Sequence, residues 1–212
     1  MLESRLEEEA VAILEAMHLA QRAAFYAVIA CWLVFLVEFG FRKRASRPQE
    51  VKRNRNATLG MLLEGVGYFM VWLQPLQRKQ FAPFAPASQV VEWSLAVLAV
   101  AVAVFSAWLV DAASRRLGKQ WALAARLVVG HKLIQDGPYG FVRNPIYLGM
   151  FGMFLATGLV LTQWIPLLVA SLLFIAGTYI RIQSEERLLR EAFGSEFEDY
   201  ARRVPALIPG IY

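Results

Sequence analysis

Polar residues able to bind a ligand are concentrated in one segment, residues 131–149, which reads HKLIQDGPYGFVRNPIYLG. The Gly-Pro pair at 137–138 forces a turn, and Pro145 fixes the backbone where an apolar stretch begins. The proline pushes Asn144 into an extended conformation, which suits it as a helix N-cap. Unpaired N–H groups and the positive end of a helix dipole favour an anion there. Arg143 adds a guanidinium that can hold a carboxylate through two hydrogen bonds.

A second polar group, formed by Arg181, Glu185 and Glu186, follows the last apolar stretch of the chain. Arg181 and Glu185 are four residues apart, so they lie on the same face of a helix. Such a group is typical of a solvated helix start as well as of a binding site. Because a short helical hairpin connects it to residues 131–149, we expect both groups at one membrane surface, where they can form a joint site.

Two carboxylates, Glu38 and Glu64, lie inside apolar stretches. Carboxylates are costly within a membrane and are candidates for function. At 1.5 Å per residue, Glu38 lies about 6 Å and Glu64 about 10 Å from the nearer end of its span. The alternative is that each pairs with a neighbouring polar group or reaches toward the membrane surface, and the sequence leaves both interpretations open.

The elements that position these residues are apolar helices. The chain has 212 residues, of which 58% are hydrophobic, whereas soluble domains are about 45–50% apolar. Crossing a bilayer core takes about 20 apolar residues. Five stretches approach this length: residues 23–41, 57–76, 89–110, 146–161 and 166–180. The sequence therefore predicts an all-α fold, a polytopic membrane helical bundle of about five transmembrane helices.

Small residues mark the fourth stretch as a packing helix. Gly152 and Ala156 are four residues apart, a spacing that lets another helix or a ligand approach the backbone closely, and packing is the favoured role. Only residues 162–165 separate the fourth and fifth stretches, which predicts a tight helical hairpin.

Basic residues predict the orientation in the membrane. Seven Lys and Arg lie in residues 42–55, six in residues 115–143 and five in the tail from Arg181 onward, whereas four lie in the remaining segments. Basic residues near span ends stay in the cytosol. We therefore expect a cytosolic carboxyl tail and active site, with the amino terminus outside. The basic charge is accounted for by this topology and by anionic membrane lipids, not by nucleic acid.

The two ends of the chain are predicted to be helical. Residues 1–22 form an amphipathic pattern, and their five glutamates are opposite to the basic start of a signal peptide. After the fifth span, the helix is expected to continue to Phe193, with Gly194 as its stop. Ser195 and Glu198 form a capping-box pattern that would begin a last short helix on the cytosolic face. Residues 23–114 are then three amino-terminal spans, and residues 115–212 form a separate core.

The motifs of the carboxyl-terminal part resemble the isoprenylcysteine carboxyl methyltransferase family, which is related to the phospholipid methyltransferases. The resemblance covers residues 115–209. The matching motifs are His131-x-Leu133, Gly137-Pro-Tyr139, Arg143-Asn-Pro-x-Tyr147-x-Gly149, Glu185-Glu186, Phe193-Gly194, Tyr200, Val204-Pro205 and Ile208-Pro209.

The resemblance implies an enzyme that uses S-adenosylmethionine and holds no metal. It implies these cofactor-binding residues: His131, Leu133, Tyr139, Arg143, Asn144, Tyr147, Glu185 and Glu186. Arg181 and Glu185 are the implied catalytic residues, with Arg181 orienting the acceptor. At the position of Asn144 the family often has a histidine. Asparagine cannot take up a proton, so a proton-transfer role is not expected at this position.

Methyl transfer from a sulfonium is an in-line displacement that mainly needs alignment of donor and acceptor. Aromatic rings such as those of Tyr139 and Tyr147 can face the sulfonium cation. A lipophilic carboxylate, such as that of a prenylcysteine, would attack as the anion. A phospholipid amine would need a base, for which Glu64 or Glu185 are candidates. The rival hypotheses are a membrane reductase that uses NADPH and a non-catalytic membrane scaffold.

Overall fold

The structure is a computed structural model that describes residues 19–37, 50–53, 57–73, 89–121, 126–128, 130–162 and 164–208. The predicted amphipathic helix of residues 1–22 falls almost entirely outside these ranges, and Glu38 lies outside them. The division into three segments at residues 22 and 114 stays a prediction.

Each of the five predicted apolar stretches forms a helix in its described part. The helices are Leu19–Val37, α2 (Ala57–Leu73), α3 (Gln89–Leu117), α4 (Pro145–Leu161) and α5 (Trp164–Phe193). Leu19–Val37, α3 and α5 are long and apolar enough to cross a membrane, while α2 and α4 are shorter apolar helices of 17 residues. The chain is an integral membrane protein built as a helical bundle.

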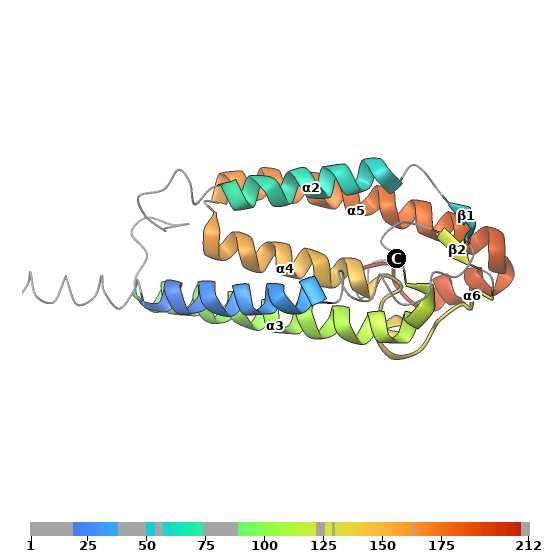
Figure 1. Cartoon of the computed structure of the whole chain (residues 1–212), viewed down its shortest axis with the longest axis horizontal. Coiled ribbons are helices and arrows are strands. Elements are labelled where there is room, and N and C mark those ends of the chain that lie inside the picture. Colours follow the sequence, from blue (N-terminus) through green and yellow to red (C-terminus); the bar gives the residue numbers. More distant parts are fainter. Residues whose placement is uncertain are drawn as a thin grey trace, which may run out of the picture.

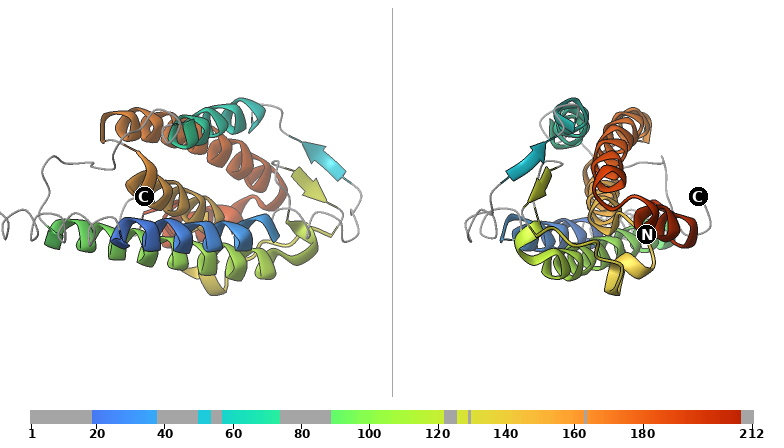
Figure 2. Two further views of the ribbon diagram at one scale, coloured as in Figure 1. Left: turned by 60° about the vertical axis from the view of Figure 1, so that its left-hand side comes forward. Right: turned by 90° about the vertical axis from the view of Figure 1, so that its right-hand side faces the viewer.

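The helices form two groups that run along the same long axis (Figure 1). In one group α2 packs along α5, and in the other α3 packs along α4 with helix Leu19–Val37 beside it, as Figure 2 also shows. Glycines allow these close approaches. A Cβ on Gly152 would lie 2.3 Å from the Ser106 hydroxyl oxygen, so the predicted packing role of this position is confirmed.

Aromatic side chains fill the core between the two groups. The ring of Tyr68 on α2 lies edge-on against Phe154 of α4 and Phe174 of α5, with centroids 5.5 and 5.3 Å away. Trp32 joins helix Leu19–Val37 to α4, because its indole N–H donates to the Thr157 hydroxyl at 3.0 Å. Both groups therefore share one apolar core.

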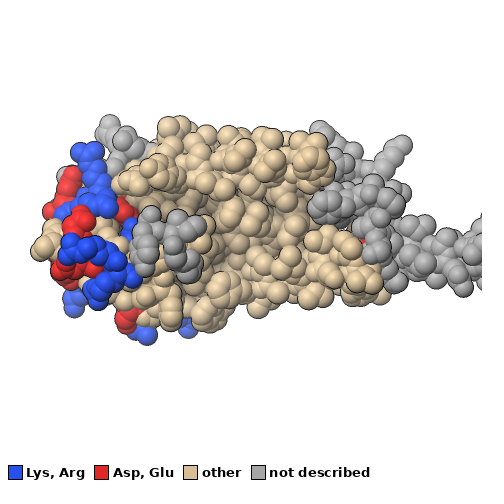
Figure 3. Space-filling model, turned by 180° about the vertical axis from the view of Figure 1, so that it is seen from behind, with Lys and Arg blue, Asp and Glu red and all other residues tan. Residues whose placement is uncertain are grey.

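A short strand pair is the element that the all-α prediction does not include. Strand β1 (Glu50–Arg53) pairs antiparallel with β2 (Arg126–Val128). Both lie in long basic connections, where extended backbone needs hydrogen-bond partners. The pair brings these two connections to one end of the bundle, and charged side chains of the described residues crowd this end (Figure 3).

The predicted continuation of the fifth helix is confirmed. Helix α5 runs without a break to Phe193, and Gly194 follows with a φ of 51°. Helix α6 (Ser195–Arg203) comes next, but the predicted capping box is wrong. Gly194 is the N-cap and Ser195 is already helical, while the Glu198 carboxylate accepts a hydrogen bond from Arg190 at 2.9 Å.

The hairpin between α4 and α5 is as short as predicted, since α4 ends at Leu161 and α5 begins at Trp164. It closes the end of the bundle opposite α6 (Figure 1). The start of α4 and the second half of α5 are thereby returned to the same end of the molecule.

Candidate functional site

The loop before α4 lies over the end of α3. Gly137 opens a short 3₁₀ turn, η4 (Gly137–Gly140), with a φ of 58° that favours glycine. A Cβ on Gly137 would lie 3.1 Å from Arg116 Nε, so the backbone approaches this side chain closely. Arg116 also binds the Asp136 carboxylate at 2.6 Å. The turn predicted from the Gly-Pro pair is confirmed.

Asn144 and Pro145 begin α4 as predicted, with Asn144 at the N-cap position and Pro145 in the first turn. The expected capping hydrogen bond is not formed by the Asn144 side chain. Its amide instead donates to the Ala206 carbonyl at 3.1 Å and to the Glu186 carboxylate at 3.5 Å. Asn144 therefore connects the start of α4 to α5 and to the carboxyl-terminal tail.

Arg143 binds a carboxylate of the chain itself. Its Nε lies 3.0 Å from Glu186 Oε1, and its Nη1 donates to the Ala201 carbonyl at 2.8 Å and to the Val204 carbonyl. The backbone N–H of Arg143 also donates to the Pro205 carbonyl at 2.8 Å. Two of the predicted site residues, Arg143 and Glu186, thus form one ion pair that also holds the tail.

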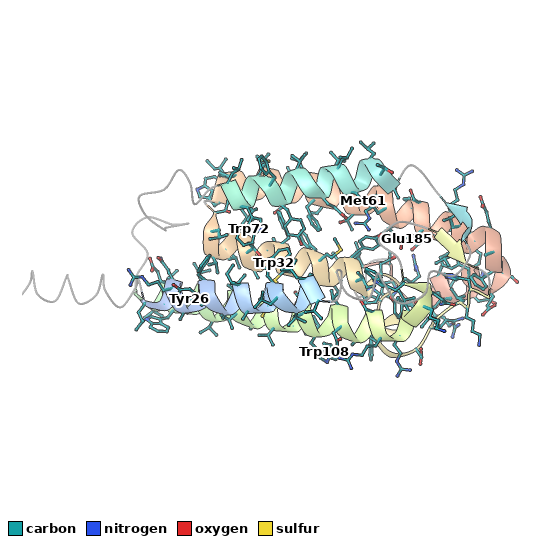
Figure 4. The ribbon with its side chains drawn as sticks, viewed as in Figure 1. Tyr26, Trp32, Met61, Trp72, Trp108 and Glu185 are labelled. Carbon is teal, nitrogen blue, oxygen red and sulfur yellow. The ribbon has the colours of Figure 1, made fainter. Side chains whose placement is uncertain are left out.

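A second cluster of predicted residues lies next to this pair. The Tyr147 hydroxyl of α4 donates to the Glu185 carboxylate of α5. The guanidinium carbon of Arg181 lies 4.7 Å from the centroid of the Tyr147 ring, within the range of a cation–π interaction. Figure 4 shows Glu185 toward the end of the bundle that carries α6.

The carboxylate that pairs with Arg181 is Glu64 of α2. The Thr178 hydroxyl donates to the other Glu64 oxygen at 2.9 Å. Sequence reasoning singled out Glu64 and allowed that it pairs with a polar neighbour, which is confirmed. It did not identify Arg181 as that neighbour, because the sequence carries no signal that α2 lies beside α5.

His131, Leu133 and Tyr139 lie at the same end of the bundle but pack toward the end of α5 and toward α6. The His131 ring lies 6.1 Å from the Phe193 ring, and Leu133 packs against Phe197, Tyr200 and Val204. The Tyr200 hydroxyl donates to the Tyr139 carbonyl at 2.7 Å.

Burial governs the ionisable groups of this loop. It lowers the pKa of His131, whose Nδ1 is buried without a hydrogen-bond partner among the described residues. It raises the pKa of Tyr139 and of Tyr200 well above the ordinary value of a phenol. The tyrosines are therefore neutral, and His131 is neutral at physiological pH.

The arrangement combines groups suited to opposite charges. The Tyr147 ring and the carboxylates of Glu185 and Glu186 suit a cation. The guanidinium of Arg181 suits a carboxylate. No group of three or more His, Cys, Asp or Glu in the described ranges is placed to hold a metal ion.

Comparison with known proteins supports the sequence resemblance. Residues 94–196 match the family model described as phospholipid methyltransferase. The chain is 38% identical over 79 residues to a protein-S-isoprenylcysteine O-methyltransferase of Schizosaccharomyces pombe, covering 37% of this chain and 34% of the relative. The corresponding protein of Saccharomyces cerevisiae is 35% identical over 83 residues, covering 38% of this chain and 34% of the relative.

A third relative carries a different description. The nickel-cobalt-cadmium resistance protein NccN of Alcaligenes xylosoxydans xylosoxydans is 32% identical over 114 residues, covering 52% of each chain. The chain thus spans between a third and about half of the length of these curated relatives.

Proposed function

We propose that the chain is an S-adenosylmethionine-dependent methyltransferase that acts on a lipophilic acceptor, because residues 94–196 match the phospholipid methyltransferase family model. One observation carries the proposal. The motif residues, which lie on α4, on α5 and in the loop before α4, converge at one end of an apolar bundle and are joined there by ion pairs and hydrogen bonds.

The residues of this end fit the cofactor chemically. S-adenosylmethionine would supply an electrophilic methyl group on a sulfonium, together with ammonium, carboxylate and ribose hydroxyl groups. Glu185 is half-buried beside the Tyr147 ring, which suits a cation. The Nδ1 of His131, which has no hydrogen-bond partner in the part of the chain that the structure describes, can accept or donate a hydrogen bond, depending on its tautomer.

We assign the other cofactor-binding roles to Leu133, Tyr139, Arg143, Asn144 and Glu186. Arg143 and Asn144 both contact Glu186, so they orient its carboxylate and close the tail over the loop. A site whose groups are already held in place needs little rearrangement when the reactants bind. Arg181 and Glu185 are the proposed catalytic residues, with Arg181 orienting the acceptor.

The proposed topology has about five spans, with the motif end and the carboxyl terminus in the cytosol and the amino terminus outside. At 1.5 Å per residue, α2 and α4 are about 25 Å long, a little shorter than a bilayer core. Local thinning of the bilayer accommodates such a mismatch. The acceptor would reach the site laterally from the bilayer, and the cofactor from the cytosol.

Calorimetry with purified protein tests this proposal. We expect S-adenosylhomocysteine to bind and NADPH not to bind. Membranes incubated with a radiolabelled methyl donor should yield a labelled lipophilic product. Binding of NADPH alone would indicate a reductase, and binding of neither compound by well-folded protein would contradict the proposed activity.

A further inference from the structure

Arg190 belongs to none of the motifs that carry the family resemblance, yet it contacts a buried carboxylate of the candidate site. It lies one helical turn after Glu186 on α5, and its Nη2 is 3.3 Å from Glu186 Oε2. The Glu186 side chain is 4% exposed and that of Arg190 is 41% exposed. Arg190 therefore reaches from the surface of the protein to a proposed cofactor-binding group.

The two oxygens of the Glu186 carboxylate are held by different donors. Oε1 accepts hydrogen bonds from Arg143 Nε at 3.0 Å and from the Asn144 amide at 3.5 Å, whereas Oε2 accepts one from Arg190. The last torsion of a glutamate side chain is soft, so donors to one oxygen leave the plane of the carboxylate poorly fixed. The contact with Arg190 fixes this plane.

The guanidinium of Arg190 also holds helix α6. Its Nε lies 2.9 Å from Glu198 Oε1, and its guanidinium carbon lies 5.2 Å from the centroid of the Phe197 ring. A guanidinium is planar and has five donors in fixed directions, so Nε and Nη2 can bind two carboxylates at the same time. One rigid group thus connects α6 to Glu186.

Helix α6 in turn packs on the loop that carries other proposed cofactor residues. The Tyr200 hydroxyl donates to the Tyr139 carbonyl at 2.7 Å, and Leu133 packs against Phe197 and Tyr200. A ligand that binds only while α6 is docked loses apparent affinity as the undocked fraction grows. Contacts that dock α6 therefore favour binding at the loop.

The ion pairs form a chain of alternating charge, in the order Arg143, Glu186, Arg190 and Glu198. An ion pair between exposed side chains contributes little by itself. Arg190 differs from such a residue because one of its two partners is buried, and the loss of a hydrogen bond to a buried charged group costs more.

We propose, building on the methyltransferase function proposed above, that Arg190 is a positioning residue for Glu186 and couples the docking of α6 to the affinity for S-adenosylmethionine. Arg190 acts through Glu186 and through α6, not by contact with the cofactor. Coupling of this kind is reciprocal, so the bound cofactor also stabilises the docked position of α6.

Calorimetry of purified protein with S-adenosylhomocysteine tests the coupling. Arg190→Gln loses both ion pairs, so the dissociation constant should rise roughly tenfold. Glu198→Gln weakens only the contact with α6, so the rise should be about two- to threefold. When Arg190 is already Gln, adding Glu198→Gln should cause no further rise, because the effect of Glu198 passes through Arg190.

Hydrogen exchange gives a second measurement on the same variants. S-adenosylhomocysteine should slow the exchange of α6 amides in the wild-type protein and slow it less in Arg190→Gln. A residue that only stabilises the fold would not change this response to the ligand.

Arg187→Gln is the matched control on the same helix. Arg187 is 72% exposed and pairs with Glu191 of α5 itself, so it connects no other element to the site. We expect this variant to leave the dissociation constant unchanged. If Arg190→Gln does not fold, Arg190→Lys keeps the charge without the planar fork and should give an intermediate rise.

Four results would contradict the proposals, each in a different way. A lower thermal midpoint with an unchanged dissociation constant would make Arg190 a structural residue only. Additive effects of the Arg190 and Glu198 changes would show that α6 is not coupled through Arg190. An equal loss of affinity in Arg187→Gln would indicate a general effect of positive charge. Failure of the wild-type protein to bind S-adenosylhomocysteine would overturn the methyltransferase proposal on which this inference rests.

Discussion

Arg143 and Arg181 are both proposed site residues, and each forms an ion pair with a different glutamate. Arg143 pairs with Glu186 within the family segment and also binds tail carbonyls. Arg181 pairs with Glu64 on α2 and stacks on Tyr147. Arg143 therefore holds the loop before α4, α5 and the tail together, whereas Arg181 joins α5 to α2 and α4.

Arg143→Ala and Arg181→Ala should consequently have different effects. Loss of Arg143 leaves the buried carboxylate of Glu186 with Arg190 as its remaining ion-pair partner and should lower the free energy of unfolding by about 1–3 kcal/mol. It should also weaken S-adenosylhomocysteine binding at least tenfold, as measured by calorimetry. Arg181→Ala should mainly lower turnover in methyl-transfer assays. Equal changes in cofactor affinity and in turnover for both variants would argue against separate roles.

Because the His131 side chain is partly buried, we expect the stability of the protein to depend on pH. Burial lowers its pKa in the folded protein below the ordinary value of about 6.5 that it has when unfolded. At pH values above this value, His131 is neutral in both the folded and the unfolded state, so its titration does not change the stability. As the pH falls below it, the unfolded state takes up the proton more readily, so the stability decreases.

Thermal melts at a series of pH values test this prediction. The thermal midpoint of the wild-type protein should fall as the pH drops from about 6.5 toward the folded-state pKa of His131. His131→Gln should reduce this fall, and since the chain has two histidines the background from the other is small. An identical pH profile in both proteins would contradict the assignment.

At the scale of elements, the contact between α2 and α5 decides whether the site forms. Gly60 and Gly177 face each other across this contact, and each would clash with the partner backbone if it carried a Cβ. Gly65 lies on α2 but meets nothing within 4 Å. All three glycines lie in apolar helices, but of the three only Gly60 and Gly177 lie close against a neighbouring helix.

Gly177→Ala should lower the free energy of unfolding by about 1–3 kcal/mol, because the added methyl group forces the helices apart. It should also raise the KM for the acceptor, since Glu64 would shift from Arg181. The matched control, Gly65→Ala, should be neutral or stabilise by about 1 kcal/mol through helix propensity. Equal stability changes in chemical denaturation of both variants would show that the close approach is not needed.

At the scale of the whole molecule, charged side chains are unevenly distributed along the long axis. On the face shown in Figure 3, charged side chains of the described residues gather at the end with α6, and much of the remaining surface carries no charged side chain. This distribution places the ion pairs of the site next to the charged end. We infer that this end faces the cytosol, in line with the distribution of basic residues.

Cysteine labelling tests the orientation. The chain has one cysteine, Cys31, so Cys31→Ala provides a cysteine-free background. On it, Glu196→Cys of α6 and Trp164→Cys of the α4–α5 hairpin place exposed thiols at opposite ends. An impermeant maleimide added to intact cells should label position 164 and leave position 196 unlabelled. The reverse pattern would place the site outside.

The sequence alone determined the positions of the helices and most of the loop geometry. The five apolar stretches, the Gly-Pro turn at 137–138, the start of α4 at Pro145 and the helix stop at Gly194 were all predictable, because each depends on residues close together in the chain. The candidate cofactor residues came from motif resemblance and stay a prediction residue by residue.

The tertiary structure decided which polar residues meet. Three contacts join residues that are far apart in the sequence: the pairing of β1 with β2, the hydrogen bonds from Arg143 to the tail, and the ion pair of Arg181 with Glu64. The apolar helices have similar hydropathy, so the hydrophobic pattern of the sequence does not determine which helices pack against each other. That choice depends on local fit, such as the glycines that let α2 approach α5 and bring Glu64 into the site.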